Sequence, residues 1–209
     1  TRAAYPISHV PSALREGVAG HPANIIMLTC DAFGVMPPVA RLSTGQAVYH
    51  FLSGYTAKVA GTELGIKEPQ ATFSACFGAP FMALPPSVYG RLLMERIKKH
   101  GARCWLVNTG WAGKPYGEGE RIKIAYSRAI IQNILDGRLE EADASPDPLF
   151  RFLVPKACPD VPPEILNPRL GAADRDRFED RAKKLLADFR QNFRQFEDEA
   201  PPEVRDAAL

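Results

Sequence analysis

Short apolar runs alternate with segments of helical periodicity along this chain. The runs "IIMLT" at 25–29 and "RCWLVN" at 103–108 have the length and composition of buried strands. Between and after them, apolar positions recur at helical spacing, which predicts helices over 44–60, 87–100 and 127–136. Strands that alternate with helices indicate an α/β fold.

Residues that cap or end helices refine these boundaries. Thr44 and Ser87 stand where N-caps are expected, and Gly101 and Gly137 stand just past the last turns. The tripeptide "IKI" at 122–124 is a further candidate strand. These signals predict several short, well-delimited elements.

The strongest periodic pattern lies near the end of the chain, over 174–197. Its apolar positions are three and four residues apart, and the remaining positions are largely charged. The apolar set comprises Phe178, Ala182, Leu185, Phe189, Phe193 and Phe196. This pattern favours a helix docked on the core over a cofactor site. The proline-rich segment 146–168 that precedes it predicts an extended strap instead of a helix or central strand.

Composition narrows the class of protein. The 209 residues carry a formal net charge of +2, which argues against a nucleic-acid or membrane surface. No apolar run is long enough to span a bilayer, and the first residues lack the layout of a signal peptide. The cysteines show no metal-binding spacing and fit a reducing cytosol: Cys30, Cys76, Cys104 and Cys158.

Two loops that follow the apolar runs could carry chemistry. The glycine-rich segment 108–121 follows a strand and leads to a helix, so it is either a nucleotide-facing loop or a plain surface loop. It matches neither a Walker A motif nor a dinucleotide fingerprint. Asp31 could be a magnesium ligand, but without a phosphate loop we expect a turn residue that binds its own backbone.

Other reactive side chains show no recognisable catalytic partners. Cys76 has no base nearby in sequence, so a buried structural thiol is expected. The histidines are expected to be surface or capping residues: His9, His21, His50 and His100.

Four long strings together resemble the ATP-dependent phosphoenolpyruvate carboxykinases. They are "LTCDAFGVMPPVARLS", "YHFLSGYTAKVAGTELGIKEPQATFSACFGAPF", "LVNTGWAGKPYGEGERIKI" and "SRAIIQNILDG", and the likeness runs from Arg2 to about Phe196. It implies the back part of a mononucleotide-binding domain, with a mixed sheet and flanking helices. It also implies a cytoplasmic enzyme of gluconeogenesis that converts oxaloacetate and ATP to phosphoenolpyruvate, ADP and CO₂.

The resemblance assigns roles to a few residues here. Arg2 would be catalytic and would reach both the γ-phosphate and the substrate. Arg121 and Ile122 would line the adenosine site, with Ser127 where the family usually has threonine. Ser127 could equally be the N-cap of the following helix. Glu120 replaces the family's usual lysine, which is unfavourable beside a nucleotide unless the carboxylate faces solvent.

The glycine-containing, polar segment at about 60–72, in the middle of the chain, would be the family's mobile lid. Thr62, Glu63 and Lys67 are candidates for contacts that form on closure, which excludes water from the reaction. Leu64 replaces the family's usual arginine and would weaken closing. The lid's hinges would be anchored by aromatic residues at its edges: Phe51, Tyr55, Phe73 and Phe77.

The resemblance also implies that this chain is a C-terminal portion of the enzyme. The phosphate loop and the ligands of Mg²⁺ and Mn²⁺ are expected in upstream sequence, so the isolated chain should be inactive and should pair with that missing part or be poorly soluble. One alternative is a non-catalytic module that binds a nucleotide or docks on a partner. Another is a remnant without a ligand, against which the intact "NTGW", "SACFGA" and "DAFG" strings argue.

Overall fold

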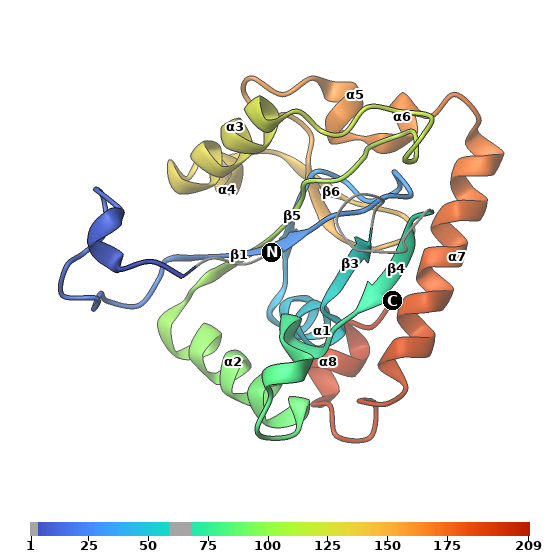
Figure 1. The fold of residues 1–209 in the computed structure, drawn as a ribbon. Helices are drawn as coiled ribbons and strands as arrows, with labels where there is room; N and C mark the ends of the chain where they lie inside the picture. The colour runs from blue at the N-terminus through green and yellow to red at the C-terminus, as the bar shows by residue number, and fades with distance from the viewer. Residues whose placement is uncertain (1–3, 59–67) are drawn as a thin grey trace.

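A five-stranded mixed sheet lies at the centre of the molecule (Figure 1). The structure is a computed structural model that describes residues 4–58 and 68–209. The strand order is β1-β5-β2-β7-β6; β1 and β5 are parallel, and the other neighbours are antiparallel. The strands are β1 Asn24–Thr29, β2 Val39–Leu42, β5 Arg103–Asn108, β6 Ala144–Pro146 and β7 Leu153–Pro155.

Successive side chains along the strands contribute alternately to two hydrophobic cores. On β5, Cys104 and Leu106 face one core, whereas Trp105 and Val107 face the other. The first core is covered by α1 Thr44–Ser53, α2 Pro86–His100, α7 Arg175–Phe193 and α8 Pro202–Asp206. The second is covered by α3 Ile124–Leu135, α4 Arg138–Glu141 and α5 Pro163–Leu166, with α6 Pro168–Gly171 next to α5. Figure 1 shows the two groups of helices on opposite sides of the sheet. The expected mixed sheet with flanking helices is therefore confirmed.

The predicted C-terminal helix is present as α7, capped by Asp174. All six residues of its apolar stripe are buried, although Phe196 lies in the turn after the helix. The ring centroid of Phe189 lies 5.0 Å from that of Tyr55 and 5.2 Å from that of Phe73. The stripe is thus a docking surface for the core, as its periodicity predicts.

Two predicted helix boundaries are wrong. Helix α1 ends at Ser53 instead of residue 60, because Gly54 adopts a left-handed conformation and β3 begins directly after it. Its N-cap is Ser43, which forms a capping box with Gln46, and Thr44 is the first helical residue. Helix α2 begins at Pro86, so Ser87 lies inside it and is not a cap, while Gly101 ends it in the left-handed conformation as expected.

Helix α3 begins three residues earlier than the sequence pattern indicates. Residues 122–124 form no strand, and Ile124 is the first helical residue. Ser127 therefore lies in the second turn and is not the N-cap, a position held by Lys123. Ile122 is 6% exposed whereas Ile124 is 77% exposed, so the two side chains do not share a buried face as they would in a half-buried strand.

The proline-rich segment 146–168 is not a simple extended strap. It contains β7, which is paired on both sides, and the short helix α5. Pro146 and Pro155 end their strands, and Pro163 opens its helix, so each proline occupies a position that tolerates the missing N–H.

A second, two-stranded sheet joins the two ends of the segment that contains the expected lid. Strand β3 Tyr55–Lys58 pairs antiparallel with β4 Gln70–Phe73, and Tyr55 lies opposite Phe73. Residues 70–72 of the expected lid therefore belong to a strand. Thr62, Glu63, Leu64 and Lys67 lie outside the described residues. Short 3₁₀ turns follow at η2 Ala75–Phe77 and η3 Ala79–Phe81, and a third, η1 Ile7–His9, precedes β1.

His50 is not at the surface, contrary to expectation. It is 2% exposed, and its ring lies 5.0 Å from Phe152 and 5.4 Å from Phe189. Burial lowers the pKa of His50 to about 3. It is a neutral core residue.

The four cysteines are free thiols. Cys76 is only partly buried, contrary to the expected buried thiol, and this partial burial raises its pKa to about 11. Among the described residues, no helix combines the length and apolar character needed to cross a membrane.

Candidate functional site

Two loops meet at the carboxyl ends of the parallel strands β1 and β5. The first, residues 30–38, follows β1, and the second, residues 109–123, follows β5. Ligands of open α/β sheets bind outside the carboxyl ends of parallel strands. This edge of the sheet is therefore the candidate site.

Asp31 organises the first loop. Its carboxylate accepts N–H bonds from Phe33 at 2.9 Å, Val35 at 2.7 Å and Met36 at 2.9 Å, and a hydroxyl bond from Tyr55 at 3.1 Å. Burial raises the pKa of Asp31, and these backbone bonds oppose that shift. The expectation of a turn residue that binds its own backbone is confirmed.

Asn108 connects the first loop to the second. Its Oδ1 accepts N–H bonds from Asp31 at 2.9 Å and Gly110 at 2.8 Å. Its Nδ2 donates to the carbonyl oxygens of Met36 at 3.2 Å and Trp111 at 3.0 Å. One fully buried amide thus holds both loops in register.

Direct backbone bonds complete this connection. Trp111 donates its N–H to Asp31 at 2.8 Å, and Tyr116 donates to Ala32 at 2.8 Å. Gly110 packs so closely that a Cβ there would overlap the backbone of Asp31. The second loop is therefore a fixed structure built on the first, which disfavours the plain surface-loop interpretation.

Arg121 lies at the exposed end of the second loop. Its Nε donates to the carbonyl oxygen of Thr109 at 2.7 Å, and one terminal nitrogen lies 3.8 Å from the sulfur of Cys30. Its guanidinium carbon lies 5.7 Å from the ring centroid of Trp111. Burial raises the pKa of the Cys30 thiol, and the positive charge of Arg121 opposes that rise. The guanidinium is held in place and still faces solvent.

The three expected adenosine residues lie on one continuous segment. Ile122, 6% exposed, donates its N–H to Gly110 at 2.7 Å, so it anchors the loop beneath Arg121. Ser127 is half-buried on the following helix α3. Glu120 is exposed, which is the orientation that a carboxylate next to a nucleotide requires.

Other expected residues cannot be placed. Arg2 and the lid residues Thr62, Glu63 and Lys67 lie outside the described residues. Within residues 4–58 and 68–209, no group of three or more His, Cys, Asp or Glu is arranged to hold a metal ion.

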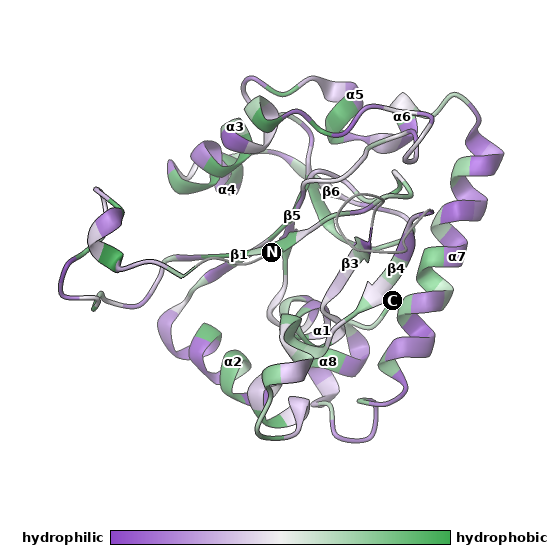
Figure 2. Cartoon of the chain, viewed as in Figure 1, coloured by the Kyte–Doolittle hydropathy of each residue, from purple (hydrophilic) through white to green (hydrophobic). Residues whose placement is uncertain are grey.

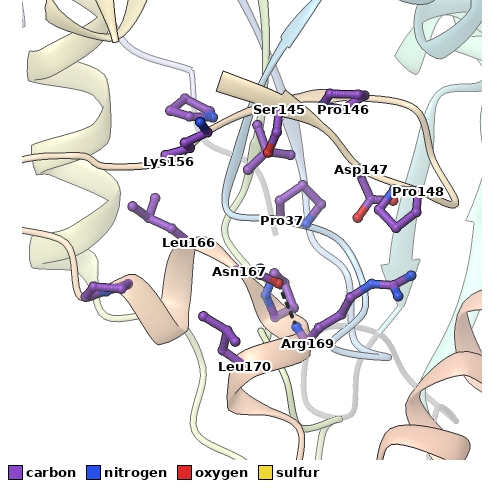
Figure 3. A pocket seen from close by; sticks show the side chains of 14 residues that line it. Pro37, Ser145, Pro146, Asp147, Pro148, Lys156, Leu166, Asn167, Arg169 and Leu170 are labelled. Atoms are coloured by element: carbon purple, nitrogen blue, oxygen red, sulfur yellow. Dashed lines mark hydrogen bonds between the residues drawn. The ribbon is translucent and has the colours of Figure 1, made fainter. Parts of the chain in front are cut away.

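A cavity of about 210 Å³ lies beside the first loop, at Pro37. Its walls come from β6, β7, α5 and α6, and Figure 3 shows prolines and Lys156 around it, with Asn167 bonded to the backbone of Arg169. Its lining includes none of the three expected adenosine residues, Arg121, Ile122 and Ser127. It therefore meets the candidate site only at Pro37 of the first loop.

The sequence analysis missed two residues that build the site. Asn108 stands at the end of a predicted strand and opens the string "NTGW", but the sequence alone does not indicate that Asn108 or Trp111 connects the two loops. A polar residue at or just past the end of each of two buried strands, Asn108 and Asp31, is a signal that could have found the connection.

The family model and the similar proteins that match this chain all point to the same family. The family model described as phosphoenolpyruvate carboxykinase matches residues 1–164. A phosphoenolpyruvate carboxykinase (ATP) from Pelobacter propionicus is 58% identical over 207 residues, which are 99% of this chain and 39% of that protein. A protein of the same name from Geobacter metallireducens is 59% identical over 94% of this chain and 37% of that protein. Another, from Dictyostelium discoideum, is 52% identical over 98% of this chain and 36% of that protein.

The chain therefore spans about two fifths of the length of these curated relatives. Both the extent of the family match and the identity to the relatives support one assignment. This chain belongs to the phosphoenolpyruvate carboxykinase family.

Proposed function

We propose that this chain is the C-terminal part of the nucleotide-binding domain of an ATP-dependent phosphoenolpyruvate carboxykinase, acting in gluconeogenesis. One observation carries the proposal: a loop fixed at the carboxyl end of β5 holds Arg121, Ile122 and, one turn into the next helix, Ser127. These are the residues that the family resemblance assigns to the adenosine site, in a chain 52–59% identical to proteins of that name.

Each residue has a role that its environment suits. Arg121 offers an exposed, planar cation whose position is set by Thr109 and Trp111. Ile122 fixes the backbone below it, and Ser127 offers a hydroxyl from α3. We propose that these groups hold the adenosine end of ATP, while Arg2 neutralises charge on the transferred phosphoryl group.

The proposed reaction balances in two steps. In oxaloacetate, the C–C bond to the departing carboxylate breaks, CO₂ leaves, and the electron pair forms the enolate of pyruvate. The enolate oxygen then forms a bond to the γ-phosphorus of ATP, the bond from that phosphorus to the bridging oxygen breaks, and ADP leaves. ATP thus supplies the phosphoryl group, and the contribution of this chain is to bind and orient it.

The metals of the proposed reaction do not fit the described part of this chain. No described cluster of acidic, cysteine or histidine side chains could hold Mg²⁺ or Mn²⁺. We assign their ligands to the upstream part of the enzyme, which is also the proposed partner of this chain.

We also propose the lid. Of the expected segment at about 60–72, the part that precedes β4 would close over the site with contacts from Thr62, Glu63 and Lys67. The β3–β4 hairpin supports this, because it ties both ends of the segment to the core through Tyr55 and Phe73, whose rings pack on Phe189.

A cytoplasmic location belongs to the proposal because all four cysteines are free thiols, as expected in a reducing compartment. The second candidate function is a non-catalytic module that binds nucleotide or docks on a partner. Nucleotide binding by such a module would require only the loop that holds Arg121 and Ile122. The two functions differ in whether catalysis follows when the rest of the enzyme is present.

Nucleotide binding is the first test. Calorimetric titration of the purified chain with ATP should show saturable binding, and Arg121→Ala should weaken it at least about 10-fold because a charge-assisted contact is lost. Arg121→Lys should recover only part of that loss, since an ammonium lacks the planar surface. Arg91→Ala removes an exposed arginine on α2 and serves as the matched control. Equal affinity in the Arg121→Ala and Arg91→Ala variants would rule out the assigned adenosine site.

A further inference from the structure

Helix α7 carries an arginine that reaches both loops of the candidate site. Arg181 lies next to Ala182 of the buried stripe, and Figure 2 shows hydrophilic and hydrophobic residues alternating along this helix. Its Nε donates to the carbonyl oxygen of Phe33, in the first loop, at 3.1 Å. One terminal nitrogen donates to the carbonyl oxygen of Gly113, in the second loop, at 3.4 Å. A single guanidinium therefore connects both loops to α7.

The two loops are in contact where Arg181 binds them. Gly113 donates its N–H to the carbonyl oxygen of Gly34 at 2.8 Å. Both glycines have positive φ, at 79° and 70°, and a Cβ at Gly34 would overlap the backbone of Lys114. A Cβ at Gly113 would overlap the backbone of Gly171, the last residue of α6. Arg181 is therefore bonded to a tightly packed junction of the two loops.

The surroundings of Arg181 suit a fixed positive charge. The side chain is partly buried, and burial lowers the pKa of Arg181, a shift that the charges of Glu118 and Asp31 oppose. Because an arginine stays protonated in proteins, both of its bonds to the loops are charge-assisted. Arg177, one turn earlier on α7, instead forms an exposed ion pair with the carboxylate of Glu118 at 2.9 Å. The two arginines thus hold the second loop in different ways.

The junction is continuous with the part of the second loop that holds Arg121. Gly113 lies two residues after Trp111, whose ring centroid is 5.7 Å from the guanidinium carbon of Arg121. The ring nitrogen of Trp111 donates to the carbonyl oxygen of Gly119 at 3.1 Å, so the ring also fixes the backbone close to Arg121. A displacement of Gly113 would therefore move the ring against which Arg121 is held.

We propose that Arg181 is a positioning residue for nucleotide binding. Its guanidinium holds the two loops at their junction, and the junction determines where Trp111 and Arg121 lie. The inference rests on the proposed function, because it concerns the adenosine site to which Arg121 is assigned. It adds a side chain of α7 that acts on the affinity for ATP through backbone carbonyls of the loops.

Calorimetric titration with ATP compares three variants of the purified chain with the wild type. Arg181→Met keeps an unbranched apolar stem but loses both bonds, so it should weaken ATP binding about 10-fold. Arg181→Lys should recover part of that loss, because an ammonium keeps the charge but lacks the planar fork. Arg177→Ala is the matched control: it removes an exposed ion pair on the same helix and should change the affinity less than about 2-fold.

Hydrogen exchange distinguishes an effect on the loops from an effect on the docking of α7. The amides of Gly113, Trp111 and Tyr116 bond to the first loop, and in Arg181→Met they should exchange at least about 10-fold faster. The amides in the middle of α7 should keep their protection. Unchanged exchange in the loops, or an equal loss of protection across α7, would show a different or merely structural role and would overturn the inference.

The titrations separate the inference from the proposed function. A wild-type chain that binds ATP no better than Arg181→Met, or an equal loss of affinity in Arg177→Ala, overturns the inference alone. A wild-type chain that does not bind ATP refutes the proposed adenosine site and the positioning role with it. If circular dichroism shows that Arg181→Met does not fold, Arg181→Lys decides: reduced affinity in a folded variant supports the inference, and wild-type affinity overturns it.

Discussion

At the scale of single residues, the candidate site depends on buried polar groups whose bonds are all made. Asp31 and Asn108 are both fully buried, and besides each other their side chains bind six backbone N–H groups or carbonyls of the two loops. A buried amide lowers the free energy of the fold only when its donors and acceptors are all paired. Because Asn108 bonds to the backbone of Trp111, on whose ring the guanidinium of Arg121 lies, the buried amide also helps to position the exposed Arg121.

Removing the Asn108 amide should be costly. Asn108→Ala leaves two N–H groups and two carbonyls without their partner, so the free energy of unfolding should fall by about 2–4 kcal/mol. Urea denaturation measures this change. Gln132→Ala, which removes an exposed side-chain bond to Asp136, should change stability by less than about 0.5 kcal/mol. Equal losses in the two variants would contradict the role assigned to Asn108.

His50 makes stability depend on pH. The pKa of His50 is about 3 in the folded protein and about 6.5 in an unfolded chain, so the unfolded state binds more protons between these values. Stability should therefore fall as pH decreases from about 6.5, by roughly 2 kcal/mol at pH 5 relative to pH 7. His50→Leu should remove this dependence, whereas His9→Leu, at an exposed position, should keep it. Urea denaturation at both pH values tests the difference, and an unchanged slope in His50→Leu would refute it.

At the scale of elements, the helices and strands that depend only on a local sequence pattern could be predicted from the sequence. Helix α7 has an unbroken apolar stripe, and β1 and β5 are continuous apolar runs, so each is predictable without its neighbours. Strand β7, three residues long, exists because β2 and β6 lie on its two sides. Periodicity cannot reveal such a strand. The position at which α1 ends also depends on tertiary packing, because the left-handed conformation of Gly54 suits the turn at Ser74 that packs on it.

The same reasoning sets the limits for the candidate site. Arg121 and Ile122 could be assigned by resemblance because they lie in one string of sequence. The connection through Asn108 could not, because Asp31 is 77 residues away and meets it only when β1 and β5 pair. Predicting such a connection requires the strand order, which no local pattern contains.

Two helix-ending glycines allow a matched test of packing at an element boundary. Gly54 and Gly101 both adopt left-handed conformations, at φ 54° and 63°. A Cβ at Gly54 would overlap the carbonyl of Ser74, whereas a Cβ at Gly101 would meet open space. Gly101→Ala should cost about 1 kcal/mol, from backbone strain, and Gly54→Ala at least about 3 kcal/mol. Thermal and urea unfolding measure both values, and similar costs would show that the turn at Ser74 moves freely.

At the scale of the whole molecule, the candidate nucleotide site combines elements that are far apart in the sequence. It lies at the carboxyl ends of β1 and β5, and Arg181 of α7 bonds to both of its loops. In the proposed function, the phosphate and metal ligands come from upstream sequence and would have to reach the same ends of the strands.

This arrangement predicts that binding and catalysis can be separated. The purified chain should bind ATP and yet release no CO₂ from oxaloacetate above the ATP-free background, because its described residues provide no metal site and it spans about two fifths of its relatives. The assay contains both Mg²⁺ and Mn²⁺, and the ATP-free control corrects for decarboxylation by the metals themselves. Adding the remaining portion of the Pelobacter propionicus protein should restore ATP-dependent CO₂ release. ATP-dependent turnover by the chain without its partner would show that the catalytic groups lie within these 209 residues.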